Sequence, residues 1–433
     1  MTIPTTTMNM NGVQVQWISD KKERGVLATR SFVAGETLFE EDPQVSAQYL
    51  YNSLYFPACE YCLTCLESPK QQAARLAGLE SEDQLDLPLA NDLLPPITRL
   101  ACPTCDAQYC SHACQTHAWN AYHQVLCPGV CTPHQVAMQQ QIIDEWKSFH
   151  YPPETATITL VLKMVAMMCV AGSDEVFTAH FKADKANSAL AIAAKFLDEQ
   201  FADRIATFAG LFQERFAGLS KGAFECTPQV FEKAFTIVAL NGQGIGTSAV
   251  EHFERALRKV ADDKDSSSSA VEPDLAAHAL EVMDTLRDLI AEHSEDFTHA
   301  EGTGLYRMHA MLNHACDANA QIEFAHGSHR LAVKATRDIE AGEEITLCYM
   351  DFGGCGDECG EGEEDDEMVV MDADGVVASS SAHHHHHHHE DEEENDDEDH
   401  EEEVDVETRR AQLREYYLFD CECNKCVAEL AQQ

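Results

Sequence analysis

Residues 102–127 read CPTCDAQYCSHACQTHAWNAYHQVLC and contain three closely spaced pairs of Cys and His residues. These pairs are Cys102/Cys105, Cys110/Cys114 and His123/Cys127, and a fourth pair, Cys59/Cys62, lies upstream. Such spacing lets one turn of chain present two soft donors to a tetrahedral ion. Eight ligands predict two structural zinc sites, which contribute about 10–16 kcal/mol each to folding. The alternative is a set of incidental cysteines, and Cys65 and His117 are near enough to replace a ligand.

The composition favours metal binding over disulfide bonds. The N-terminal residues carry no basic segment followed by an apolar one, so we do not expect secretion, and the 18 Cys should stay reduced. The net charge of -46 excludes a general nucleic-acid binder, because attraction to phosphates needs a basic surface. The longest apolar run, 155–172, contains Lys163 and is short for a membrane span, which favours a buried helix.

Hydrophobic periodicity predicts strand-rich ends around a helical middle. Strands are expected at 13–17, 36–39, 320–325, 331–335 and 344–349, and helices at 155–170, 188–216, 229–240 and 274–293. The proline-containing insert between Cys62 and Cys102 is expected to be a surface loop. Residues 353–407 hold 24 acidic residues, a run of His and no Lys or Arg, which predicts disorder.

A glycine-rich segment, Gly244-x-Gly246-x-x-Ala249, superficially fits a dinucleotide-binding fingerprint. Long helical patterns flank it on both sides, so the strand–helix–strand context of that fingerprint is missing. We therefore expect a structural turn that lines a pocket.

The stretch from Cys110 to Cys127 resembles a MYND zinc finger. In that family the first and third pairs share one zinc ion, and the second and fourth pairs share the other. The resemblance implies two ligand sets: Cys59, Cys62, Cys110 and Cys114 for one ion, and Cys102, Cys105, His123 and Cys127 for the second. The 39 residues between Cys62 and Cys102 depart from the short link of most MYND fingers.

Three further segments resemble a SET domain. Residues 22–29 resemble its opening, 313–319 its central Asn-His motif and 342–351 its closing strand. Their order, with the finger inserted after the first, resembles the SET-and-MYND (SMYD) family of protein-lysine methyltransferases. Segments 122–129, 149–156 and 241–248 resemble the branch of that family whose chains end soon after the last cysteine.

The resemblance implies an α+β fold. This is a pseudoknot-like SET β-fold with an inserted MYND zinc finger, a helical insertion and a post-SET zinc tail. The expected boundaries are 1–58 and 301–352 for the SET core, 59–127 for the finger, 128–300 for the helical insertion, 353–407 for a disordered insert and 408–433 for the tail.

The tail supplies a third set of metal ligands. Cys421, Cys423 and Cys426 offer three thiolates, whereas a tetrahedral structural zinc needs four ligands. The resemblance implies Cys316 as the fourth ligand, and a loose Cys-rich tail is the alternative.

The resemblance also implies S-adenosylmethionine as the cofactor. Its binding residues would be Asn313, His314, Lys22, Arg24, Gly25, Asn241, Tyr349 and Phe419, with Lys22, Arg24 and Gly25 at its amino-acid end. Tyr349 is the first choice, and Tyr417 the second, for orienting the substrate amine. Each of these residues also has a purely structural interpretation, because a tyrosine in a strand usually packs in the core and a lone Asn-His pair usually forms a turn.

Three residues depart from the family motifs. Glu23 stands where the family has a glycine, and a glycine there allows the backbone to approach the cofactor closely. Ala315 and Ala318 stand where the family has Ser and Pro. A catalytically weak or inactive protein is therefore an alternative.

We expect a protein-lysine N-methyltransferase of the nucleus, the cytoplasm or both. The acidic charge favours a basic protein substrate, and histones or ribosomal proteins are the family's usual classes. The rival hypothesis is a MYND/SET adaptor that binds proline-containing peptides, and a metal-buffering role for the His-rich and acidic tracts is a third. We expect no direct binding to nucleic acids or membranes.

Overall fold

The computed structural model describes residues 9–10, 12–90, 92–149, 157–181, 199–222, 224–262, 273–294, 298–350, 404–417 and 419–432. The chain divides into two compact units, Met1–Leu347 and Cys348–Gln433. The prediction of disorder for 353–407 falls outside the described residues except at 404–407. There Asp405 accepts hydrogen bonds from the backbone of Glu407 and Thr408, and helix α12 already begins at Val406.

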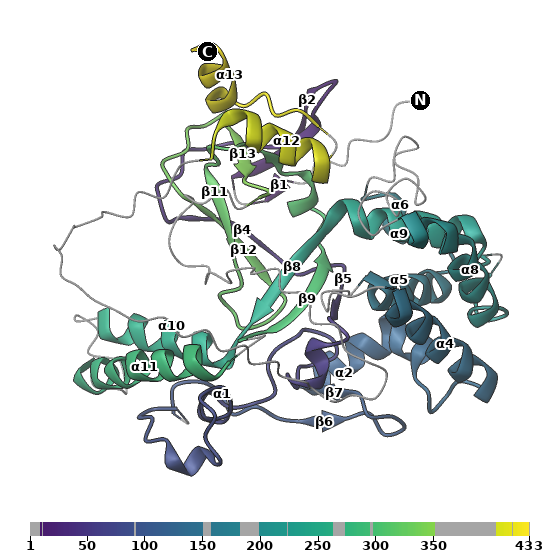
Figure 1. The fold of residues 1–433 in the computed structure, drawn as a ribbon, viewed down its shortest axis with the longest axis horizontal. Coiled ribbons are helices and arrows are strands. Elements are labelled where there is room, and N and C mark those ends of the chain that lie inside the picture. The colour runs from purple at the N-terminus through teal and green to yellow at the C-terminus, as the bar shows by residue number, and fades with distance from the viewer. Residues whose placement is uncertain are drawn as a thin grey trace, which may run out of the picture. The chain divides into compact units, whose positions relative to one another are not determined.

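Strands from both ends of the first unit pair in one sheet (Figure 1). Its order is β1-β2-β3-β13-β10, with β1 Asn9–Met10, β2 Val13–Ser19, β3 Glu23–Ala28, β13 Glu344–Leu347 and β10 Asn313–His314. Strand β13 runs antiparallel to β3 and parallel to β10. The three segments that resemble a SET domain therefore lie in adjacent strands.

Three further sheets complete the described strands of this unit. They are β11 (Ala320–Glu323), β12 (Leu331–Ala335) and β4 (Thr37–Glu41); β5 (Val45–Gln48), β9 (Ala300–Leu305) and β8 (Gly242–Thr247); and β6 (Leu100–Ala101) with β7 (Gln108–Tyr109). The segment from Gly244 to Ala249 was expected to form a turn, and that prediction is wrong for its first four residues, because Gly244 to Thr247 belong to β8 and pair with β9. The pairing is antiparallel, whereas a dinucleotide-binding unit needs parallel strands.

A helical layer packs on the zinc-finger region and on β5 (Figure 1). Its helices are α4 (Pro133–Phe149), α5 (Thr157–Ala171), α6 (Glu175–Thr178), α8 (Glu199–Arg215) and α9 (Pro228–Asn241). The predicted helices at 155–170 and 229–240 are confirmed, and the first eleven residues of the predicted helix 188–216 lie outside the described part. Within the described residues no helix is long and apolar enough to cross a membrane.

The sequence indicated a surface loop for the insert between Cys62 and Cys102, and that prediction is wrong. The insert contains α1 (Pro69–Leu76), whose buried Ala73 and Ala74, with Ala77 just after the helix, pack with α10 (Ala249–Asp262) and α11 (Pro273–His293). Helix α1 begins here because Ser68 and Gln71 form a reciprocal capping box and Pro69 follows the cap. Tertiary packing therefore turns the insert into part of a second core.

Short helices complete the description. In the first unit they are η1 (Asn52–Leu54), η2 (Glu82–Gln84), α2 (His112–Ala118), the π-helical turn η3 (Trp119–His123), α3 (Gln124–Leu126) and η4 (His309–Met311). The second unit contains α12 (Val406–Tyr416) and α13 (Asn424–Leu430).

Candidate functional site

The first metal cluster consists of Cys59, Cys62, Cys110 and Cys114, whose sulfur atoms all lie within 4.8 Å of one another. The Cys110 sulfur is 3.5 Å from that of Cys62 and 3.5 Å from that of Cys114. Four thiolates around a zinc ion at about 2.3 Å lie about 3.8 Å apart, so these distances fit zinc.

The second cluster consists of Cys102, Cys105, His123 and Cys127. The sulfur atoms of Cys102 and Cys127 are 3.9 Å apart, and His123 Nε2 is 3.4 Å from the Cys105 sulfur. Both ligand sets are those that the resemblance to the MYND finger implies. The near-miss residues have other surroundings, since Cys65 contacts Glu67 and the His117 ring packs on Tyr61.

The second unit gathers the sulfur atoms of Cys421, Cys423 and Cys426 within 4.8 Å of one another. The chain thus carries three Cys/His clusters suited to zinc, the third with three ligands from its own unit. Cys316 belongs to the first unit, where its sulfur lies 3.4 Å from His314 Nε2. Its role as the fourth ligand stays a prediction.

A hydrogen-bonded group joins β3, β10 and β13. Asn313 Nδ2 donates to the Arg24 carbonyl at 3.0 Å and to Glu344 Oε1 at 2.8 Å, and Lys22 Nζ contacts Glu344 Oε2 at 2.7 Å. Both amide hydrogens of Asn313 are thereby used, so its side chain offers a ligand only the acceptor Oδ1. Because Lys22 is paired with Glu344, it is less suited to the amino-acid end of a cofactor than the sequence indicates.

Gly25 allows this group to assemble. A Cβ atom at Gly25 would lie 2.6 Å from a side-chain carbon of Ile18, 2.8 Å from Asn313 Nδ2 and 2.9 Å from Glu344 Oε1. No larger residue fits there without displacing the Asn313–Glu344 hydrogen bond.

The sequence analysis missed two residues of this group, Glu344 and Asn319. Asn319 is 1% exposed, donates to the Glu344 carbonyl at 2.9 Å and accepts from the Thr346 N–H at 2.9 Å. It ties the loop after the Asn-His motif onto β13. Asn319 could have been found from its place at the end of the 313–319 motif. Glu344 could not be found in this way, because its partners come from remote segments.

Glu41 fixes the segment that leads into Asn313. Its carboxylate accepts hydrogen bonds from the backbone N–H groups of Arg307, Met308 and His309, at 2.7 to 3.1 Å. Burial raises the pKa of this carboxyl, although the three N–H groups lower it. The backbone of η4 is thereby anchored to β4.

Glu23 has a backbone φ of 56°, in the left-handed region. A residue with a Cβ atom loses about 1–2 kcal/mol in that region. We expect Glu23→Gly to be about 1 kcal/mol more stable than Glu23→Ala, although glycine ordinarily weakens a strand. Urea unfolding of the two variants checks this, since both lack the carboxylate and differ only in the backbone preference. An alanine variant as stable as the glycine variant contradicts it.

Three predicted residues meet in the second unit. The Tyr417 hydroxyl donates to the Tyr349 carbonyl at 2.8 Å, and the two ring centroids are 5.1 Å apart. The Phe419 ring stands nearly perpendicular to that of Tyr349, with centroids 6.4 Å apart. Burial raises the pKa of Tyr417, which keeps its hydroxyl protonated. Tyr349 follows two residues after Leu347, the strand partner of His314.

Asn241 is the last residue of α9, and its Nδ2 donates to the Ile237 carbonyl at 2.9 Å. This bond satisfies a carbonyl at the helix end. Its predicted cofactor contact stays a prediction.

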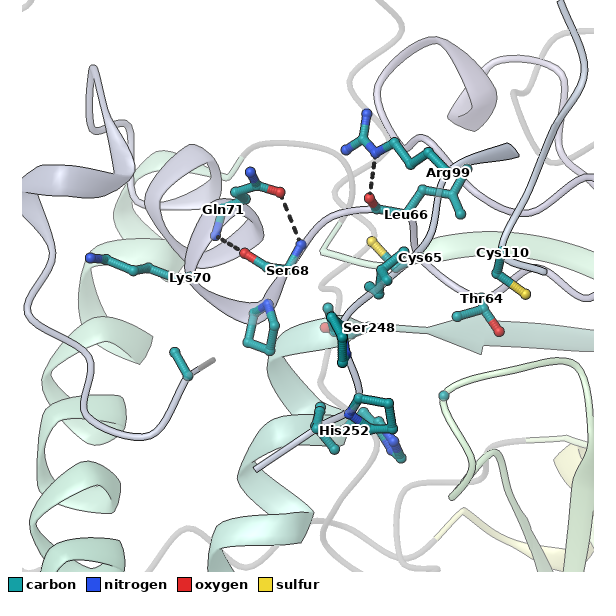
Figure 2. Close-up of a pocket in the computed structure, with 18 of the residues that line it drawn as sticks. Thr64, Cys65, Leu66, Ser68, Lys70, Gln71, Arg99, Cys110, Ser248 and His252 are labelled. Carbon is teal, nitrogen blue, oxygen red and sulfur yellow. Dashed lines mark hydrogen bonds between the residues drawn. The ribbon is translucent and has the colours of Figure 1, made fainter. Parts of the chain in front are cut away.

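A pocket of about 940 Å³ lies elsewhere, between the edge of the finger, the insert and the start of α10 (Figure 2). Figure 2 shows Ser68 and Gln71 exchanging hydrogen bonds on one wall and Arg99 reaching the Leu66 carbonyl on another. Its described lining includes the zinc ligand Cys110 but none of the predicted cofactor-binding residues. The pocket is thus separate from the group around Asn313.

Comparison with known proteins agrees with this geometry. The SET domain family matches residues 23–350. The mouse "Protein-lysine N-trimethyltransferase SMYD5" is 32% identical over 427 residues, which span 96% of this chain and 87% of that protein. The human protein of the same name is 30% identical over 421 residues, which span 96% of this chain and 87% of that protein. The mouse "Histone-lysine N-methyltransferase SMYD3" is 31% identical over 128 residues, or 30% of this chain and 18% of that one.

Proposed function

This chain belongs to the SET-and-MYND family of protein-lysine methyltransferases, and we propose that it transfers a methyl group from S-adenosylmethionine to a lysine amine of a basic protein. One observation supports this most strongly. Arg24, Asn313 and Glu344 come from segments far apart in the sequence and are joined by direct hydrogen bonds in one sheet.

The residues around Asn313 fit the cofactor. When bound, S-adenosylmethionine supplies a methyl group activated by its positive sulfonium. Asn313 Oδ1 is available to its ammonium, and the glycine at position 25 keeps the backbone of β3 close to Asn313. His314, Asn241, Tyr349 and Phe419 would complete the binding residues, as the family resemblance implies.

The aromatic residues of the second unit would prepare the substrate amine. A lysine amine has a pKa of about 10.4 and must lose its proton before it reacts. Apolar surroundings disfavour the charged form and lower that pKa. The rings of Tyr349, Tyr417 and Phe419 offer such surroundings. Because the Tyr417 hydroxyl is bonded to the Tyr349 backbone, we assign Tyr349 to the amine and Tyr417 to positioning Tyr349.

The charge of the chain supports a basic substrate. The net charge is -46, and 24 of the acidic residues lie in 353–407. A histone tail or a ribosomal protein has the complementary charge. Such substrates would place the enzyme in the nucleus, the cytoplasm or both.

The function is tested by binding and by transfer of label. The protein should bind S-adenosylhomocysteine in calorimetry and should label a protein in nuclear or ribosomal extract from radioactive S-adenosylmethionine. Absence of any cofactor binding would favour the adaptor. For that alternative, Trp119 in the finger is 40% exposed and offers an aromatic face to a proline-containing peptide.

Tyr349→Phe should lower the rate of methyl transfer by about 100-fold, a typical loss for one hydrogen-bonding group at a reacting centre. The fold should survive, because Tyr417 bonds to the backbone of Tyr349 and not to its hydroxyl. Single-turnover rates with zinc content as the fold control measure this. Tyr55→Phe, at a 49% exposed tyrosine of the other unit, is the matched control. An unchanged rate and product for Tyr349→Phe would remove its catalytic role.

A further inference from the structure

Arg215, the last residue of α8, is fully buried and has no carboxylate partner. Among the described residues it forms no ion pair, whereas Arg204 on the same helix pairs with Glu145. Burial lowers the pKa of the Arg215 guanidinium, and the groups that raise it are the thiols of Cys131 and Cys169. The guanidinium stays protonated even so, because its ordinary pKa is above about 12. The core therefore contains a positive charge that no carboxylate of the described residues balances.

The hydrogen bonds of Arg215 do not replace that balance, because their acceptors are neutral. Its Nε and Nη2 donate to Gln139 Oε1 at 3.2 and 2.8 Å, and Nη2 also donates to the Val125 carbonyl at 2.9 Å. Nη1 is buried and has no hydrogen-bond partner among the described residues. The Phe216 ring centroid is 5.0 Å from the guanidinium carbon, which adds a weak attraction. These contacts fix the guanidinium in place without cancelling its charge.

The same bonds place Arg215 beside the second metal cluster. Val125 lies midway between two ligands of that cluster, His123 and Cys127. On the other side of Cys127, the backbone N–H of Cys131 donates to the Cys127 carbonyl at 3.1 Å, and the Cys131 sulfur is 3.4 Å from Arg215 Nη2. Arg215 therefore bonds to the chain both before and after a metal ligand.

The second cluster has the opposite charge when it holds zinc. Its cysteines, Cys102, Cys105 and Cys127, bind the metal as thiolates, and His123 binds it as a neutral imidazole. Three thiolates and one Zn²⁺ leave one net negative charge. Of the four ligands, Cys105 alone is half-buried and the others are buried. Buried opposite charges attract more strongly than exposed ones, because water and salt screen them less.

The first cluster has a similar buried cation, but that cation is already paired. Lys163 Nζ donates to the backbone carbonyl of Glu60, which lies between the ligands Cys59 and Cys62. It is also 2.9 Å from the Glu60 carboxylate. In both clusters a buried cation thus bonds to a carbonyl between two metal ligands, and only Arg215 lacks a carboxylate of its own among the described residues.

We propose that Arg215 is the counter-charge of the second cluster and slows the loss of its metal. The inference does not depend on the proposed methyl transfer. The alternative is that Arg215 only holds the Val125 carbonyl in place. Gln139→Glu separates the two roles, because it keeps an acceptor of the same shape for Arg215 but cancels the positive charge. If Arg215 only positions Val125, the added ion pair should hold it at least as firmly. If the charge itself retains the metal, the cluster should lose it faster.

The rate of metal loss from the full chain tests this. With cobalt(II) in place of zinc, the imidazole ligand gives the second cluster an absorption spectrum distinct from that of the all-thiolate first cluster, and excess EDTA captures the released metal. Arg215→Met should lose cobalt from the second cluster about tenfold faster than the unmodified protein, because one nearby charge is removed. Gln139→Glu should lose it about fivefold faster. Both variants should leave the rate at the first cluster within about twofold.

The matched control is Arg204→Met, which removes an exposed arginine from the same helix and should leave both rates unchanged. An unchanged rate for Arg215→Met overturns the inference. An unchanged or slower rate for Gln139→Glu also overturns it, because Arg215 would then act only by holding Val125. Equal acceleration at both clusters would indicate a general loosening of the finger and would contradict the inference as well.

Discussion

Replacing Cys127 with alanine should remove one zinc ion and unfold the finger. The Cys127 side chain is fully buried, and its sulfur is 3.9 Å from that of Cys102. A structural zinc site contributes about 10–16 kcal/mol to folding, as much as the whole net stability of a typical domain. The finger cannot replace that contribution, because its core is built around the ligands themselves.

Elemental analysis and limited proteolysis measure the outcome. The unmodified chain should carry three zinc ions and Cys127→Ala two, with new cleavage within 59–127. Cys131→Ala is the matched control, because Cys131 lies outside the clusters and its sulfur contacts the Val125 carbonyl at 3.2 Å. Cys423→Ala tests the tail site in the same way. A count of two in the unmodified chain would remove the tail site.

Lys163→Met should destabilise the first unit by about 3–5 kcal/mol, the usual loss when one partner of a buried ion pair is removed. The Lys163 side chain is 5% exposed, and its ammonium is 2.9 Å from Glu60 Oε1. It also donates to the carbonyls of Ser46 and Glu60 at 3.0 and 2.8 Å and lies over the Tyr122 ring. It thereby joins α5 to β5 and to the finger, and a methionine would leave these acceptors unpaired.

A double-mutant cycle separates the ion pair from the rest of the network. Glu60→Gln keeps an acceptor for the Tyr122 hydroxyl, which is 2.8 Å from Glu60 Oε2, but loses the charge. Urea unfolding should show that the double variant is less destabilised than the sum of the single variants. A loss below about 1 kcal/mol for Lys163→Met would mean that water replaces the ammonium.

Local patterns accounted for much of the fold. The strand at 331–335 and the helices in 155–170 and 229–240 could be predicted because each buries a face that repeats along its own sequence. The prediction for the insert before Cys102 was wrong, because this proline-containing stretch includes a short capped helix whose alanines are buried in a core shared with α10 and α11. The glycine-rich strand β8 was missed for a related reason, since pairing with β9 overrides its low strand propensity.

Local sequence alone identifies the Cys/His ligand pairs, the apolar helix around Lys163 and the segments that carry the site. Each depends on neighbours within a few residues, where spacing and covalent geometry leave few choices. The packing of distant elements, in contrast, places Glu344 between Lys22 and Asn313 and brings Lys163 to Glu60. These contacts join residues 322 (Lys22 and Glu344), 103 (Lys163 and Glu60) and 31 (Asn313 and Glu344) positions apart, so they depend on how separate elements pack and not on any local pattern.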